Sequence, residues 1–167
     1  MKELTKVLGS AITGPLKQKA IETFEKQMQE WGIIMPPVEP LVMDFGLGDF
    51  YHTGLIEYWI ANEIEAGYCG KFLFVFDKQT CPAHQHTEKH ETFYIVKGCV
   101  QMFYNGKTFE MNAGDLLTVE VNNVHSFTGI GSALLLEISK PCLIQDNHFM
   151  NSKINIAGEQ RTFTIVE

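Results

Sequence analysis

One helical pattern of hydrophobic residues stands near the start of the chain. From Pro15 to Trp31, apolar side chains recur at three- and four-residue spacing with Lys and Glu between them. Gly14 and Pro15 place a proline in the first turn, and Gly32 follows the last apolar position, as is typical of the two ends of a helix. The pattern predicts an amphipathic helix whose apolar face packs on the outside of a sheet or on a partner subunit.

After a proline-rich connector, "MPPVEP", the pattern changes to short runs rich in aromatic and β-branched residues, at spacings of about ten residues. The runs are 41–45, 55–61, 71–76, 92–96, 99–104, 107–111, 116–121, 124–128 and 133–139. Asn105 and Gly106 lie between two of them and predict a two-residue hairpin, because a type I′ turn needs positive φ at both central positions. Nine short strands in succession predict an antiparallel sandwich or barrel.

The length of the chain fits one compact domain. With 167 residues, 45% of them hydrophobic, a single core can bury most of the apolar surface. We expect an N-terminal helical arm and connector at 1–40, a barrel at 41–150 and a C-terminal tail at 151–167. The tail ends in a candidate final strand, "RTFTIVE".

Charge and composition restrict the partners. A net charge of −7 without any run of Lys or Arg argues against binding to nucleic acid or to an anionic membrane surface. The N-terminal residues lack the apolar segment of a signal peptide, and no uncharged stretch approaches the ~18 residues that span a bilayer. We therefore expect a cytoplasmic protein with a small-molecule partner. The scattered cysteines predict reduced, mostly buried thiols and include no CxxC pair; they are Cys69, Cys81, Cys99 and Cys142.

The candidate chemistry lies in "CPAHQHTEKHETF", residues 81–93. His84 and His86 are two apart, so they project from the same side of an extended chain, and Glu91 lies on the strand that follows. The chain can bring His125 back beside them, because two further strands and a hairpin lie between Glu91 and His125. Three imidazoles and one carboxylate suit divalent Mn, Fe, Co, Ni or Zn, with open positions for water or substrate oxygens.

The spacing His84-x-His86-x4-Glu91-x6-Gly98 resembles the first motif of the cupin superfamily in full. This resemblance implies an all-β, cupin-type antiparallel barrel (a double-stranded β-helix or jelly roll) with the N-terminal helix added. It also implies that one metal is bound through His84, His86, Glu91 and His125.

The second cupin motif is matched less closely. Gly114 and Asp115 open it, and His125 supplies its histidine. Glu120 and Asn122 stand where cupins usually carry a proline and a glycine. The turn before His125 can therefore have a different shape.

A narrower resemblance, over residues 41 to 150, is to the D-lyxose ketol-isomerase family. The stretches that carry it are "MDFGLGDF" (43–50), "QTCPAHQH" (79–86), the H-x-H-x-x-K-x-E run from His84 to Glu91, "ETF" (91–93), "LEIS" (136–139) and "DNHF" (146–149). Lys89 and "DFGLG" are its more particular features. The resemblance implies isomerisation of D-lyxose to D-xylulose, and often of D-mannose to D-fructose, with a divalent metal that is commonly Mn²⁺.

Such a reaction moves a hydrogen between C2 and C1, so it needs a Lewis acid, a base and a group that holds the enediolate charge. Lys89 has the strand parity of Glu91 and points toward the metal if the strand begins early; the resemblance implies that it stabilises the developing charge or shuttles a proton. Glu137, in "SALLLEIS", is the candidate base if it faces the barrel interior, whereas on an edge strand it would face water. Further candidates for the base are Asp146, Asn147 and Glu159.

Other functions stay open. An iron dioxygenase or a lyase would use the same metal ligands, and a non-catalytic sugar-binding cupin would need neither an inward Lys89 nor a base. Lys89 and "DFGLG" favour the isomerase. His90 has the opposite strand parity and is expected to face away from the metal. We also expect a homodimer, because an exposed helix face or sheet edge is best covered by a partner.

Overall fold

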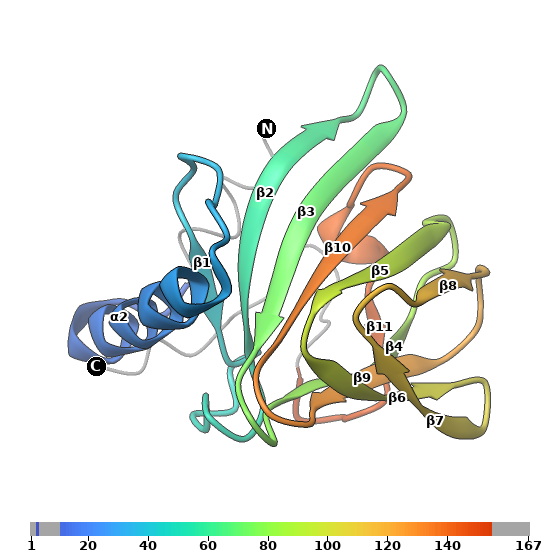
Figure 1. Ribbon diagram of the computed structural model, residues 1–167. Helices are drawn as coiled ribbons and strands as arrows, with labels where there is room; N and C mark the ends of the chain where they lie inside the picture. Colours follow the sequence, from blue (N-terminus) through green and yellow to red (C-terminus); the bar gives the residue numbers. More distant parts are fainter. Residues whose placement is uncertain (1–2, 4–10, 155–167) are drawn as a thin grey trace.

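The structure is a computed structural model that describes Glu3 and residues 11–154. Helix α2 (Gly14–Trp31) precedes the strands (Figure 1). The strands are β1 (Leu41–Met43), β2 (Leu55–Glu63), β3 (Tyr68–Val75), β4 (Thr80–Gln85), β5 (Glu91–Lys97), β6 (Cys99–Tyr104), β7 (Lys107–Asn112), β8 (Leu116–Val119), β9 (His125–Gly129), β10 (Ala133–Ser139) and β11 (His148–Phe149). A short 3-10 helix, η1 (Ile144–Asp146), lies before β11.

The strands form two antiparallel sheets. The first has the order β1-β2-β3-β10-β5-β8 and the second the order β11-β4-β9-β6-β7. One hydrophobic cluster joins side chains of both sheets, such as Leu73 and Phe93 from the first and Met102 and Phe127 from the second. The core therefore lies between the sheets, and the predicted all-β jelly-roll class is confirmed.

Helix α2 covers the outer face of the first sheet (Figure 1). Its buried Phe24 stacks on Tyr58 of β2 with ring centroids 5.1 Å apart, and meets Phe74 of β3 edge-on at 4.9 Å. Gly32 ends the helix in the left-handed conformation, with φ 67°. The predicted helix and its packing on the outside of a sheet are thus confirmed, and β2 and β3 are covered on both faces.

The hairpin prediction is also confirmed. Asn105 and Gly106 have φ of 47° and 82°, and the turn they form pairs Tyr104 with Lys107. Strands β4 and β11 are missing from the nine predicted runs. In β4, Pro82 has no N–H to donate, and the ladder with β9 is irregular between Cys81 and His84, which weakens the strand pattern.

The turn before His125 keeps a left-handed residue. Asn122 has φ 62°, a conformation that asparagine tolerates better than other non-glycine residues. Its N–H donates to the carbonyl of His86 at 2.7 Å, which ties the two cupin motifs together. Asparagine thus supplies the conformation for which glycine is common.

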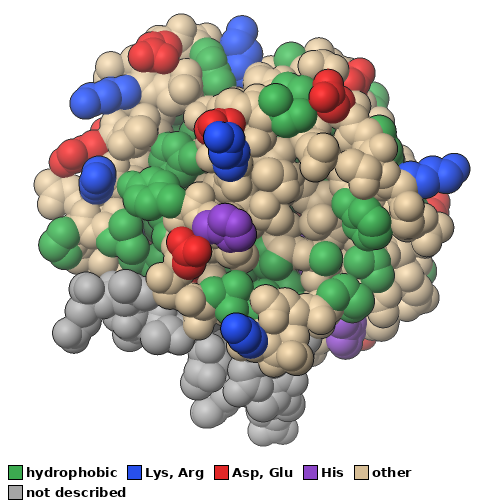
Figure 2. All heavy atoms as spheres, turned by 90° about the horizontal axis from the view of Figure 1, so that it is seen from below, with side chains coloured by type: hydrophobic (Ala, Val, Ile, Leu, Met, Phe, Trp, Pro, Cys, Tyr) green, Lys and Arg blue, Asp and Glu red, His purple; other side chains and the backbone are tan. Residues whose placement is uncertain are grey.

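Figure 2 shows one face, on which basic side chains are scattered among acidic, polar and hydrophobic ones. In the part of the chain that the structure describes, no helix is long and apolar enough to cross a membrane.

The four cysteines are free, and all but Cys99 are buried, as predicted. The candidate strand "RTFTIVE" and Glu159 lie outside the described residues.

The "DFGLG" turn has a strained backbone. Phe45 adopts φ 58°, which is uncommon for a bulky residue, and its side chain is buried. The buried carboxylate of Asp44 accepts hydrogen bonds from the N–H groups of Gly46 and Gly48, each at 2.9 Å. These two bonds hold the chain in the conformation that Phe45 requires.

The turn gives a stability prediction. Asp44→Ala removes the charged acceptor of two part-buried hydrogen bonds, so we expect the free energy of unfolding to fall by about 1–3 kcal/mol in denaturant titrations. The matched control is Asp49→Ala, which changes an exposed aspartate nearby and should leave stability nearly unchanged. Equal stability of the Asp44→Ala protein and the wild type would contradict the assigned role.

Candidate active site

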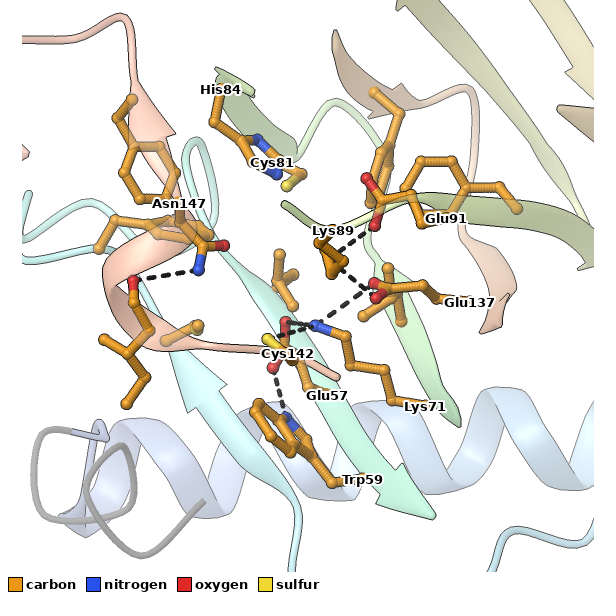
Figure 3. Close-up of a pocket in the computed structure, with 18 residues that line it drawn as sticks. Glu57, Trp59, Lys71, Cys81, His84, Lys89, Glu91, Glu137, Cys142 and Asn147 are labelled. Atoms are coloured by element: carbon orange, nitrogen blue, oxygen red, sulfur yellow. Dashed lines mark hydrogen bonds and ion pairs between the residues drawn. The ribbon is translucent and has the colours of Figure 1, made fainter. Parts of the chain in front are cut away.

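A cavity lies between the two sheets (Figure 3), and its wall combines apolar and charged side chains. One part of its wall is apolar, with side chains such as Phe93, Phe127 and Phe149. Another part carries charged side chains from the first sheet and from the loop before β5. A polar substrate can therefore meet both an apolar surface and fixed charges.

The three predicted histidines come together beside this cavity, and His84 lines it. His84 on β4 and His125 on β9 are direct partners across the ladder, and His86 follows β4. One ring nitrogen from each lies within 4.8 Å of the others, and all three side chains are buried. Pairing of β4 with β9 thus brings the two cupin motifs to one point.

Each ring has a fixed orientation, because its Nδ1 contacts a backbone carbonyl. The three acceptors are the carbonyl oxygens of Pro82, Asp146 and Asn123, at 2.8, 2.8 and 3.1 Å from His84, His86 and His125. Donation from Nδ1 leaves the Nε2 lone pair free for a metal. Burial, together with His125 and His86, holds the pKa of His84 well below its usual value, and burial also lowers the pKa of His86, so both rings stay neutral.

Glu91, the fourth predicted ligand, lies against two of these rings. Its Oε1 is 2.9 Å from His125 Nε2 and 3.4 Å from His86 Nε2. These three buried atoms have no hydrogen-bond partner among the described residues. If each of these histidines carries its proton on Nδ1, the lone pair of its Nε2 faces the lone pairs of Glu91 Oε1. This arrangement is costly unless a cation lies between the atoms. The donor set therefore fits a divalent metal.

Lys89 points into the cavity, but for a different reason from the one predicted. Strand β5 begins at Glu91, so Lys89 lies in the preceding loop and strand parity does not place it. Instead, the buried Asp146 carboxylate accepts from the N–H groups of Thr87, Glu88 and Lys89 at 2.9, 3.1 and 2.8 Å. These bonds fix the loop.

The same hydrogen bonds bear on whether the Asp146 carboxylate can act as the base. Burial would raise the pKa of Asp146, but the hydrogen bonds from Thr87 and its neighbours outweigh burial and lower it. Its carboxylate is engaged with the loop, so Asp146 is a weaker candidate for the base than Glu137. Asn147 lines the cavity, where its Nδ2 donates to the carbonyls of Leu143 and Ile144, and an amide is not a base.

Glu137 faces the cavity from the middle of the first sheet, where β10 lies between β3 and β5 (Figure 3). Its side chain is 2% exposed, so the alternative of an edge glutamate facing water is wrong. Lys89 Nζ lies 2.9 Å from Glu137 Oε1 and 2.6 Å from Glu91 Oε2. Burial would lower the pKa of Lys89, but the carboxylates of Glu137 and Glu91 outweigh burial and raise it. The lysine is therefore an ammonium ion between a candidate metal ligand and a candidate base.

Sequence reasoning missed three polar residues of this cavity: Glu57 and Trp59 on β2 and Lys71 on β3. Lys71 Nζ is 3.3 Å from Glu57 Oε1, and Trp59 Nε1 donates to Glu57 Oε2 at 2.6 Å. The sequence does contain a signal that Glu57 and Lys71 face inward. Glu57 stands between the inward Leu55 and Trp59 at two-residue spacing, and Lys71 stands two residues before the inward Leu73.

The remaining histidines lie away from the metal candidates or stay unassigned. His90 is 41% exposed and contacts Glu120 at 3.0 Å, which agrees with its predicted outward direction. His148 is 40% exposed, and His52 contacts the hydroxyl of Thr53. None of these three lines the cavity described above.

Known proteins with similar sequences support the resemblance found in the motifs. The sequence model of the D-lyxose isomerase family matches residues 20–102, and that of the cupin domain matches residues 72–139. The D-lyxose/D-mannose isomerase of Thermosediminibacter oceani is 30% identical over 141 residues, which cover 68% of this chain and 77% of that protein. The D-lyxose ketol-isomerase of a Thermofilum species is 40% identical over 72 residues, 39% of this chain and 38% of that protein.

Solved structures agree on the fold. The crystal structure of Acinetobacter sp. DL28 L-ribose isomerase in complex with L-ribose superposes with a TM-score of 0.72, at 14% identity, over 95% of this chain and 99% of that one. Identity that low shows a shared fold alone. Taken together with the 30% identity over most of a D-lyxose/D-mannose isomerase, the cupin sheets and the motifs show that this chain belongs to the D-lyxose isomerase family of the cupin superfamily.

Proposed function

We propose that this aldose-ketose isomerase depends on a divalent metal, Mn²⁺ in preference to Zn, Fe, Co or Ni, and interconverts D-lyxose with D-xylulose and D-mannose with D-fructose. The substrate choice is supported by the relative named D-lyxose/D-mannose isomerase. One observation carries the proposal: the buried cluster of three histidines and Glu91 lies beside the buried pair of Lys89 and Glu137. The residues of this group that line one cavity are His84, Lys89, Glu91 and Glu137.

His84, His86, Glu91 and His125 would hold the metal. When bound, a divalent metal supplies a Lewis acid that polarises the oxygens on C1 and C2 of the open-chain sugar. The fixed Nδ1 contacts suit the three histidines to this role. Burial of all four side chains keeps competing water away from the reacting carbons.

Glu137 acts as the base. Its carboxylate takes the proton from C2 of the aldose; the electron pair left behind forms the C1–C2 double bond, and the carbonyl pair moves to O1. Return of the same proton to C1, with transfer of the proton on O2 to O1, gives the 2-ketose. The position of Glu137 on a central strand, facing the cavity, supports this assignment.

Lys89 stabilises the negative oxygen that forms during this transfer. Its ammonium group is buried between Glu91 and Glu137, so it lies beside both the metal ligands and the base. A fixed ammonium in a site that excludes water stabilises a developing oxyanion more strongly than it would in solution. It can also carry the proton exchanged between O1 and O2.

The competing functions make different demands on the site. A dioxygenase or a lyase could use the same four ligands, and a sugar-binding module would need only the metal or the cavity. A buried Lys89 in contact with a buried Glu137 serves neither alternative directly, and burial of charged side chains is costly. This pair therefore favours the isomerase.

We further propose that the protein acts in the cytoplasm as a homodimer. The four free cysteines support a reducing compartment. The edge strand β8 exposes Leu116 to 68%, which suits an edge covered by a partner. Light scattering should give twice the chain mass of 18.9 kDa, and a mass of one chain would contradict the dimer.

Metal dependence can be tested by chelation. We expect purified protein with added Mn²⁺ to convert D-lyxose and D-mannose to their ketoses, EDTA to abolish turnover and Mn²⁺ to restore it. Sugar analysis by chromatography measures the conversion, and mass spectrometry measures bound metal. The screen should include other pentoses and hexoses. Failure to convert any aldose would refute the isomerase, and turnover that resists EDTA would refute the metal.

The catalytic pair can be tested by substitution. Glu137→Gln and Lys89→Met should each lower kcat by about 10²- to 10⁴-fold, because each removes a group that acts in proton transfer or charge stabilisation. Bound metal should stay unchanged, since neither residue is a ligand. Matched controls are Glu120→Gln and Lys97→Met, which alter exposed residues outside the cavity. Wild-type kcat in the Glu137→Gln protein would remove Glu137 as the base.

A further inference from the structure

The cavity holds charged groups for which the proposed reaction has no direct use. Beyond Glu137, Lys71 Nζ lies 3.3 Å from Glu137 Oε2 and 3.3 Å from Glu57 Oε1. Lys71 is 5% exposed and Glu57 is 6% exposed. Burying an ammonium and two carboxylates opposes folding unless they are well paired, so their presence calls for an explanation.

The strand register places Lys71, Glu137 and Trp59 in one row of the first sheet, and Glu57 stands two residues before Trp59 on β2. Lys71 on β3 is the direct partner of Glu137 on β10 and, on its other side, of Trp59 on β2. The ring of Trp59 has its centroid 5.1 Å from Lys71 Nζ, and its Nε1 donates to Glu57. Glu57 is thus held by the indole, and Lys71 is held between the indole ring and two carboxylates (Figure 3).

Lys71 has a fixed charge. Burial would lower the pKa of Lys71, but its neighbours Cys142, Glu137 and Glu57 outweigh burial and raise it well above the usual value. The other group near its ammonium is Cys142 Sγ, at 3.9 Å. The Lys71 ammonium therefore uses its hydrogen-bond donors in contacts with protein groups.

We propose that Lys71 is a positioning residue for Glu137, and that Glu57 and Trp59 serve to hold Lys71. This inference rests on the proposed role of Glu137 as the base. It assigns Lys71 no contact with the sugar.

The contacts of the Glu137 carboxylate show why a second lysine is needed. Oε1 is bound by Lys89 Nζ at 2.9 Å and by Ser139 Oγ at 3.0 Å, whereas Oε2 contacts Lys71. The terminal torsion of a glutamate has a broad, shallow energy profile, so contacts at one oxygen leave the carboxylate plane free to turn. A separate ammonium on Oε2 fixes that plane. The Lys71 ammonium also stays in contact with Glu137 when Lys89 turns to the negative oxygen of the substrate.

A positioning role predicts a particular kinetic result. Lys71→Met should lower kcat by about 10- to 100-fold, because a misplaced base is a poor one. KM should stay within about twofold of the wild type, because no sugar contact is lost. The matched control is Lys97→Met on strand β5 of the same sheet, an exposed lysine outside the cavity, which should leave both constants unchanged. A rise in KM at unchanged kcat would overturn the inference and make Lys71 a sugar-binding residue.

Chemical rescue separates the ammonium from the shape of the side chain. Lys71→Ala removes the atoms of a propylammonium ion, so added propylammonium should restore kcat, whereas the neutral isostere 1-propanol should not. Equal rescue by the two compounds would show that Lys71 acts by filling space and would overturn the inference.

The single variants leave buried carboxylates unpaired and can fail to fold. Glu57→Gln combined with Lys71→Met removes one charge of each sign and keeps an acceptor for Trp59, so it folds more readily. It should still lose kcat, with normal bound metal. Wild-type kcat in this double variant would overturn the inference while leaving the isomerase intact.

A crystal structure supplies a readout that does not depend on turnover. In the double variant, the Glu137 carboxylate should rotate or shift by more than about 0.5 Å, the tolerance of a productive site. An unmoved carboxylate would overturn the inference even if the protein isomerised no sugar. Failure of the wild type on every aldose would instead refute the proposed function, so the two failures can be told apart.

Discussion

Alternation of charge across the buried cavity is the constraint on which the site depends. Glu91, Lys89, Glu137, Lys71 and Glu57 follow one another in contact, so each ammonium lies between two carboxylates. Three carboxylates and two ammonium groups sum to one negative charge. A divalent cation at the histidines would bring the total to one positive charge. In the proposed reaction, proton transfer from C2 to Glu137 keeps this total and moves a negative charge from the Glu137 carboxylate to the enediolate oxygens, where Lys89 can stabilise it.

Such a row of charges needs a rigid support, and the first sheet provides it. Glu57, Lys71 and Glu137 stand on three adjacent strands that do not lie at the sheet edge. Helix α2 covers the outer face of β2 and β3 through Phe24, so these strands are packed on both sides. Side chains on central strands are held more precisely than side chains on loops. The N-terminal helix thus contributes to the site without touching it.

The sequence predicts the local features well and the long-range ones less well. The helix, the Asn105-Gly106 turn and the inward side of the His84 and His86 pair depend on neighbours along the chain, where periodicity and turn chemistry apply. Glu57 and Lys71 are different. Parity marks them as inward, but only the pairing of β3 with β10 shows that Lys71 meets Glu137, and a single sequence does not reveal that pairing.

Lys89 shows how a correct prediction can rest on an incomplete cause. Parity with Glu91 predicts an inward side chain, yet the loop is shaped by Asp146, which is 57 residues further along the chain. The same Asp146 accepts from Nδ1 of His86 through its backbone carbonyl. One residue of the short helix η1 therefore orients His86, a candidate metal ligand, with its backbone and Lys89, the candidate catalytic lysine, with its carboxylate. A shift of η1 would move His86 and Lys89 together, so the spacing that the proposed reaction needs between them is preserved.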